Sequence, residues 1–126
     1  MKKLWWAVVV LALLLSATLW NSHCVAAVTD DLAAQLSRAC ELAESGDWKT
    51  AEKITRAAQE QWEDATGYLY TVLPHSSTDA VEVGFHEVLE FLTCQESGEY
   101  SAANAVLIAH IRLLSDMERL TPRNLL

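Results

Sequence analysis

Two hydrophobic patterns divide the chain. The first is an unbroken apolar run of 17 residues without a charge, LWWAVVVLALLLSATLW, which spans Leu4–Trp20. The second is a series of helical stripes, in which apolar residues recur every three or four positions through the rest of the chain. The first pattern predicts a lipid-embedded helix, and the second predicts an all-α domain built from amphipathic helices.

The apolar run predicts a single transmembrane helix. At about 1.5 Å per residue it spans roughly 25 Å, and weaker apolar character through Val28 extends it toward a bilayer core of about 30 Å. Trp5, Trp6 and Trp20 lie at the two ends of the run, where indole rings favour the headgroup region. The two Lys residues that precede the run predict a cytoplasmic N-terminus and an extracytoplasmic C-terminal domain.

A cleaved signal peptide is the alternative to an anchor. Cys24-Val25-Ala26 is a small-x-small site, so cleavage would follow Ala26 or Ala27 and would release a secreted protein. We favour the uncleaved anchor because the apolar run is long and Trp residues flank it.

The chain therefore divides into a membrane segment, residues 1–28, and a helical domain, residues 29–126. Three breaks separate four helices in this domain: Ser45-Gly46-Asp47, Pro74 and Ser97-Gly98-Glu99. Gly supplies a left-handed C-cap, an acid supplies the next N-cap, and the residue before a proline leaves the α region.

Each helix has an apolar stripe that predicts its buried face. The stripes are Leu32, Leu36, Ala39 and Ala43; Trp48, Ala51, Thr55, Ala58, Trp62, Ala65, Leu69 and Val72; Val81, Phe85, Val88 and Leu92; and Tyr100, Ala103, Leu107, Ile111 and Leu114. We expect Ser77 or Thr78 to cap the third helix, and the fourth helix to end before Pro122. Because no linker separates Val28 from Asp30, the anchor is expected to run directly into the first helix.

The two Gly-containing breaks share a local pattern. Glu44–Ala51 (ESGDWKTA) resembles Glu96–Ala103 (ESGEYSAA), with a Gly cap, an acid, an aromatic residue and then Ala. This pattern predicts two similar helical hairpins, packed as an up-down bundle of about four helices. The offset of 52 residues is unlike the repeat of about 34 in tetratricopeptide proteins, and one pair is too few for a solenoid.

The charge of the helical domain argues against nucleic-acid binding. All 17 acids but only seven of the nine basic residues lie after Val28, so residues 29–126 have a net charge of −10. This field repels phosphate backbones. With 4 Gly and 2 Pro, the chain also has too few turn residues for a β-sandwich or barrel.

Several features resemble an uncharacterised bacterial family. They are the Trp-containing hydrophobic start, Gly46–Lys53 (GDWKTAEK), Trp62, His75 and Asp79-x-x-Glu82. Over nearly the whole chain they resemble the family catalogued as domain of unknown function 4363. The resemblance implies a small membrane-anchored helical protein of Gram-positive, spore-forming bacteria, and it assigns no activity or catalytic residue. The family pattern has acids directly after the His, where this chain has Ser76 and Ser77.

Four side chains are candidates for contacting a partner: Trp48, Trp62, His75 and Tyr100. Exposed aromatic rings anchor many protein interfaces, although two Trp on one helical stripe are more typical of a core. His75 could bind a carboxylate or titrate near pH 6.5, whereas the ordinary role of a polar residue at this boundary is to cap a helix end.

The cysteines and histidines raise two further hypotheses. Cys40 and Cys94 each precede a Gly-containing break, so an up-down bundle puts them at the same end, where a disulfide could join them; two free thiols are the alternative. Glu82, His86, Glu90 and Cys94 recur every four residues on one face. Such a stripe could hold a metal ion, with His110 from the next helix, but a solvated face is the more common outcome.

No phosphate-binding loop, zinc-protease motif or nucleophile elbow occurs in the sequence. We therefore expect a non-enzymatic, membrane-anchored protein of the cell envelope, without a cofactor, whose helical bundle binds another protein or self-associates. The alternative is a small secreted or envelope enzyme, or a metal binder, that uses His86, Glu90 and Cys94.

Overall fold

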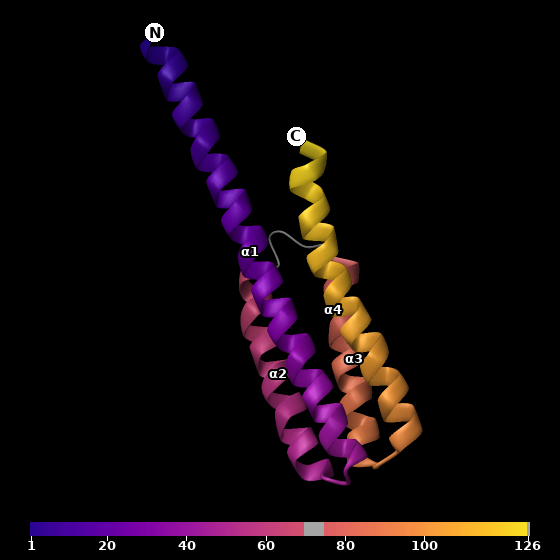
Figure 1. The fold of residues 1–126 in the computed structure, drawn as a ribbon. Coiled ribbons are helices and arrows are strands. Elements are labelled where there is room, and N and C mark those ends of the chain that lie inside the picture. The colour runs from indigo at the N-terminus through magenta and orange to yellow at the C-terminus, as the bar shows by residue number, and fades with distance from the viewer. Residues whose placement is uncertain (70–74, 126) are drawn as a thin grey trace.

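The computed structural model describes residues 1–69 and 75–125, and these form four helices without a strand. The helices are α1 (Lys2–Glu44), α2 (Trp48–Leu69), α3 (His75–Thr93) and α4 (Ser97–Leu125). For residues 21–22, 67–69, 75–77 and 117–125 the backbone alone is described. The helices run up and down beside one another (Figure 1), so the predicted all-α bundle is confirmed.

Each helix packs against two neighbours. The backbone of α1 lies close to those of α2 and α4, and the backbone of α3 also lies close to those of α2 and α4, whereas in the described residues the diagonal pairs α1/α3 and α2/α4 have no such close backbone approach. Both tight turns lie at one end of the bundle and the two chain termini point toward the other (Figure 1). We call the end with the two turns the distal end, because it is farthest from the hydrophobic N-terminal run.

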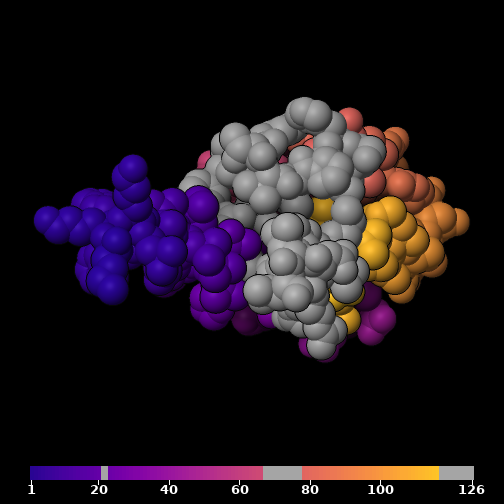
Figure 2. Space-filling model, turned by 90° about the horizontal axis from the view of Figure 1, so that it is seen from above, coloured from indigo at the N-terminus to yellow at the C-terminus, as the bar shows by residue number. Residues whose placement is uncertain are grey.

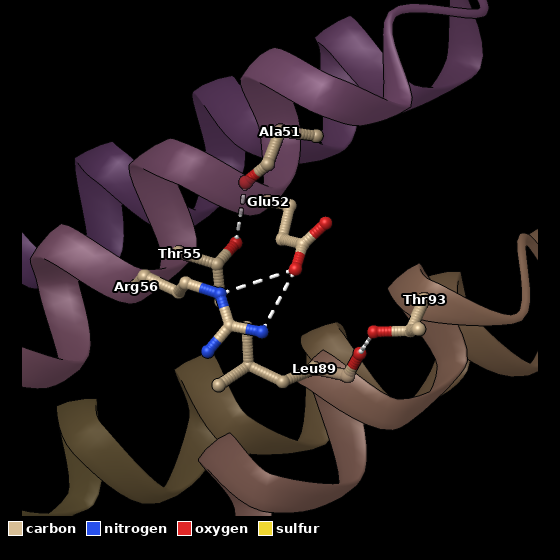
Figure 3. Close-up of polar contacts among 6 residues, drawn as sticks. All are labelled: Ala51, Glu52, Thr55, Arg56, Leu89 and Thr93. Carbon is tan, nitrogen blue, oxygen red and sulfur yellow. Dashed lines mark hydrogen bonds and ion pairs between the residues drawn. The ribbon is translucent and has the colours of Figure 1, made fainter.

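The predicted apolar stripes form the core. Every stripe residue whose side chain is described is buried or half-buried, including Trp62, Phe85 and Leu36 at 0% exposure. Burying one such large side chain contributes about 1.5–3 kcal/mol. Thr55 is the polar member of the α2 stripe, and its hydroxyl donates to the Ala51 carbonyl at 2.9 Å (Figure 3). That bond lets a hydroxyl occupy the core without an unpaired donor.

α1 is one continuous helix of 43 residues in two environments. Its first half is almost entirely exposed, and Figure 2 shows it standing clear of the bundle. Its second half is packed, and buried positions alternate steps of four and three along Val25, Thr29, Leu32, Leu36, Ala39 and Ala43. The expected continuation of the hydrophobic run into the first helix of the bundle is confirmed. The packed stripe begins at Val25, one turn before the predicted boundary at residue 29, because the heptad pattern continues upstream through Thr29.

The first turn has the predicted caps. Gly46 has φ of +91°, and its N–H donates to the Ala43 carbonyl at 3.0 Å. The Asp47 N–H donates to the Leu42 carbonyl at 2.9 Å, and the Asp47 carboxylate accepts the Thr50 N–H at 3.2 Å. Gly46 therefore closes α1 and Asp47 caps α2, as the sequence predicted.

The second turn lies three residues before the predicted break at Ser97-Gly98-Glu99. Its left-handed residue is Gln95, with φ of +54°, and Gly98 lies inside the first turn of α4. The Gln95 N–H donates to the Leu92 carbonyl at 3.1 Å, which repeats the bond made by Gly46. The two left-handed residues, Gly46 and Gln95, are thus 49 residues apart, whereas the sequence patterns are offset by 52. The position of the turn is set by the last core residue of α3 and not by the glycine.

Two other predicted helix ends are wrong. α3 begins at His75, so Ser77 and Thr78 do not cap it. Thr78 lies within the helix, and its side chain is buried. α4 continues through Pro122 to Leu125, since a proline removes one backbone N–H without ending every helix that contains it. Val72 and Pro74, expected at the end of the second helix, lie outside the described residues.

The two turns generate a stability prediction. Gln95→Gly is expected to raise the free energy of unfolding by about 0.5 kcal/mol, because glycine relieves a left-handed strain of about 1–2 kcal/mol at some cost in chain entropy. Gly46→Ala is the matched change, and we expect it to lower that free energy by about 1 kcal/mol. Urea unfolding of the full chain in detergent, followed by circular dichroism, measures both. Effects of the same sign would contradict the assigned turn geometry.

Candidate functional site

Three of the four candidate partner residues can be placed. Trp62 is 0% and Tyr100 is 1% exposed, so both are core residues and the prediction that they contact a partner is corrected. Trp48 is half-buried, and its ring packs edge-on against Tyr100 with centroids 6.0 Å apart. This contact joins the start of α2 to the start of α4 and closes the distal end. The His75 side chain lies outside the described residues.

A polar cluster lies in the core beneath this aromatic contact. The Asn104 side-chain amide donates to the Leu36 carbonyl at 3.0 Å, which ties α4 to α1. Asn104 Oδ1 and the Tyr100 hydroxyl have no hydrogen-bond partner among the described residues. Burial, with smaller contributions from Cys40 and Glu44, raises the pKa of Tyr100, and the nearby Thr55 side chain opposes this shift in part. The phenol is therefore held as the neutral form and cannot act as a base or nucleophile near neutral pH.

Of the two alternatives considered for Cys40 and Cys94, the structure has the two free thiols and not the disulfide. Cys40 and Cys94 are both free thiols, and they belong to α1 and to the turn after α3, which are diagonal elements of the bundle. Sharing the distal end is thus insufficient for pairing, because the geometry of a disulfide needs adjacent backbones. Burial and the Glu44 carboxylate raise the pKa of the Cys40 thiol, so Cys40 remains protonated and is a poor nucleophile.

The hypothesis of a metal site on α3 is also wrong. His86, Glu90 and Cys94 are exposed, and within the described residues no group of three His, Cys, Asp or Glu side chains could hold a metal ion. Spacing of four along one helix puts adjacent side chains on one face, but a metal needs ligands that converge from several directions. The neighbouring helix does not supply them.

The feature that the structure adds is a shallow hollow on the outer face of α3 and α4. We call it the α3/α4 groove, and its lining residues are Asp79, Ala80, Val83, Gly84, Glu87, Phe91, Glu99, Ala102, Ala103, Val106 and His110. Val83 is 64% and Val106 is 56% exposed. Both lie outside the predicted core stripes. The feature of the sequence that could have indicated the groove was therefore this pair of β-branched apolar residues without a core position.

The groove is shallow because two helices approach closely at its floor. A Cβ atom added to Gly84 would lie 2.8 Å from Leu107 Cδ1, which is closer than a real contact. Gly84 thus permits the α3–α4 approach, and the small side chains of Ala80 and Ala103 leave the hollow open. The result is an apolar channel along the seam between two helices.

Comparison with known proteins identifies a family without a known activity. The family described as domain of unknown function (DUF4363) matches residues 19–125. The chain belongs to this family. The match begins inside α1 before the packed stripe and includes the whole bundle, so the DUF4363 unit contains the α3/α4 groove. No curated protein and no solved structure matches the chain.

Trp62 offers a test of its assignment to the core. We expect Trp62→Ala to lower the free energy of unfolding by about 3–5 kcal/mol, because it opens a large cavity among α1, α2 and their neighbours. Trp62→Phe is the control, since it keeps an aromatic ring and removes an indole N–H that has no partner among the described residues. The Phe variant should lose much less of the free energy of unfolding than the Ala variant. Wild-type stability of Trp62→Ala in urea would show that the ring is not buried.

Tyr100 generates a pH-dependent prediction. Because its buried hydroxyl is unpaired, Tyr100→Phe should raise the free energy of unfolding by about 1 kcal/mol at neutral pH. The folded chain retains the phenol proton that the unfolded chain releases near pH 10, so wild-type stability should fall further as the pH rises above about 10. The variant should lack this part of the decline. Parallel stability curves for the two proteins from pH 7 to 11 would refute the buried phenol.

Proposed function

We propose that this protein is a non-enzymatic interaction module of the cell envelope, held by an uncleaved N-terminal helix. Its N-terminus lies in the cytoplasm, and its acidic bundle contacts another protein on the extracytoplasmic side. The observation that carries the proposal is α1, a single helix whose first half exposes an apolar surface and whose second half is built into the bundle core.

The exposed half of α1 supports the membrane anchor. Among the described residues, α1 is the one helix long and apolar enough to cross a bilayer, and no part of its most apolar stretch is buried in the bundle. Trp5, Trp6 and Trp20 are 67–71% exposed at the two ends of this surface, where a bilayer has its headgroups. A signal sequence satisfies the same length and composition.

The packed half of α1 favours an anchor over a signal peptide. Cleavage after Ala26 or Ala27 would cut within a continuous helix and would remove Val25, which is 0% exposed in the core. The buried hydroxyl of Thr29 donates to the Ala26 carbonyl at 3.0 Å, so that segment also loses a helical contact. A chain that keeps its first 26 residues keeps the whole heptad stripe.

The exposed thiol at the distal end provides a topology test. In a chain with Cys24→Ser and Cys40→Ser, Cys94 is the one remaining thiol, and it is exposed. A membrane-impermeant maleimide should label it on intact cells. The control is Lys2→Cys in a chain with all three cysteines replaced, which should react after permeabilisation alone. Labelling of Cys94 that also requires permeabilisation would contradict the orientation, and a mature protein starting at Ala27 or Val28 would establish a signal peptide.

The interaction itself is tested by photo-crosslinking in cells. A photoreactive amino acid is placed at single exposed positions: Arg38 on α1, Glu63 on α2, and Val83 and Val106 in the α3/α4 groove. We expect at least one position to form a crosslink to another protein, and mass spectrometry can then identify the crosslinked residue. An absence of crosslinks at all four positions, in cells that contain the anchored protein, would overturn the proposed function.

A further inference from the structure

The α3/α4 groove combines exposed apolar side chains with an uncompensated acidic rim. Val83 and Val106 face solvent from neighbouring helices, and Phe91 is half-buried farther along the same hollow. Asp79, Glu87 and Glu99 line the same surface. Contiguous exposed apolar surface with a polar rim is characteristic of an interaction site.

The acids around the groove have no basic neighbours in sequence. Between Arg56 and Arg112 the chain contains nine Asp and Glu residues but no Lys or Arg. Within the described part of the chain the one ion pair joins Arg56 to Glu52 on α2, at 2.8 Å (Figure 3), and none involves α3. His110 is the one other titratable side chain in the groove. The rim therefore presents negative charge that an external cation can neutralise.

The dimensions of the groove suit a short helix. On α3 it extends from Asp79 to Phe91, which at about 1.5 Å per residue is roughly 18 Å, or about three helical turns. Its floor is the seam between two closely approaching helices, and a third helix packs into such a seam by inserting a ridge of side chains. Recognition of an amphipathic helix by an apolar groove follows the same geometry.

We propose that the α3/α4 groove binds an amphipathic helix of another protein that carries Lys or Arg on both sides of an apolar stripe. This inference rests on the proposed function and specifies its partner. The apolar stripe of that helix covers Val83 and Val106, and its flanking cations lie over Asp79, Glu87 and Glu99. Complementary charge at the rim supplies specificity and speeds association, while the apolar contact supplies most of the affinity.

The negative charge of the rim argues against two other occupants of the α3/α4 groove, a second copy of the chain and an anionic membrane. In a symmetric pair of chains the same patch would face itself, so the acids of one rim would meet the acids of the other. Like charges at that distance repel, and the net charge of −10 on residues 29–126 adds to the repulsion. An anionic membrane surface is disfavoured for the same reason.

A designed peptide tests the chemistry of the partner. The probe is an 18-residue fluorescein-labelled helix with a Leu/Ala stripe flanked by Lys, and the control peptide has Glu in place of each Lys. Binding to the full chain in neutral detergent is followed by fluorescence anisotropy. We expect the Lys peptide to bind and the Glu peptide to bind at least about tenfold more weakly, which corresponds to about 1.4 kcal/mol.

Matched charge variants locate the binding surface. Asp79→Asn, Glu87→Gln and Glu99→Gln together remove three charges from the groove rim. Glu41→Gln, Glu63→Gln and Asp64→Asn remove three charges from exposed positions on α1 and α2. The groove variant should weaken binding of the Lys peptide about tenfold, and the control less than about twofold. Equal losses would show non-specific attraction to an acidic protein and would overturn the inference.

A neutral variant tests the apolar contact. Val83→Ser with Val106→Ser leaves the charge unchanged and alters two exposed positions, so the fold should persist, which circular dichroism checks. Binding of the Lys peptide should again weaken about tenfold, because two buried methyl-bearing contacts are lost. Undiminished binding would mean that the groove is not where the peptide lies.

Crosslinking in cells separates this inference from the proposed function. A crosslink from Val106 that maps to a Lys- or Arg-bearing amphipathic helix supports the inference. Crosslinks from Arg38 or Glu63 alone would overturn it while leaving an interaction module in place. A Val106 crosslink to a second copy of the chain, or to a segment without basic residues, would also overturn it. If none of the four positions forms a crosslink, the proposed function itself is overturned.

Discussion

The absence of any break in α1 is the constraint on which the rest of the structure depends. A helix of 43 residues is roughly 65 Å long, and its two halves differ: the first half exposes apolar side chains, and the second half buries a heptad stripe. Because no linker intervenes, the axis of the hydrophobic first half sets the axis of the bundle. α2 and α4 pack directly on α1, and both tight turns are carried to the distal end.

The bundle is held in register by a few contacts that an apolar core alone would not specify. Asn104 bonds the Leu36 carbonyl and so relates α4 to α1 along their common length. Trp48 packs against Tyr100 and joins the two hairpins at the distal end. A single buried polar residue can select one alignment among several that bury similar apolar area, at some cost in stability. The unpaired Asn104 Oδ1 is consistent with that cost.

Periodicity predicted most of this architecture, because a heptad stripe reports directly which side of a helix is buried. It predicted the core from Leu32 to Leu114, and Gly46 predicted the cap. The absence of a linker predicted that the hydrophobic run continues into the first helix. Prediction failed where tertiary packing overrides local preference: Gln95 takes a left-handed conformation because α3 and α4 meet there, although Gly98 is nearby. The groove was not predicted, although Val83 and Val106 lie outside the core stripes, because its shape depends on how closely α3 approaches α4 at Gly84. Whether metal ligands converge on one point likewise depends on packing, which is why the metal hypothesis was wrong.

The continuity of α1 can be measured as one distance. Leu13 lies in the exposed half and Glu41 in the packed half, 28 residues apart and both exposed. Spin labels at Leu13→Cys and Glu41→Cys, in a full chain with Cys24, Cys40 and Cys94 replaced by Ser and reconstituted in lipid nanodiscs, allow pulsed electron paramagnetic resonance. An unbroken helix predicts one narrow distribution near about 42 Å. A broad or markedly shorter distribution would reveal a hinge between the hydrophobic first half of α1 and the bundle and would contradict the account.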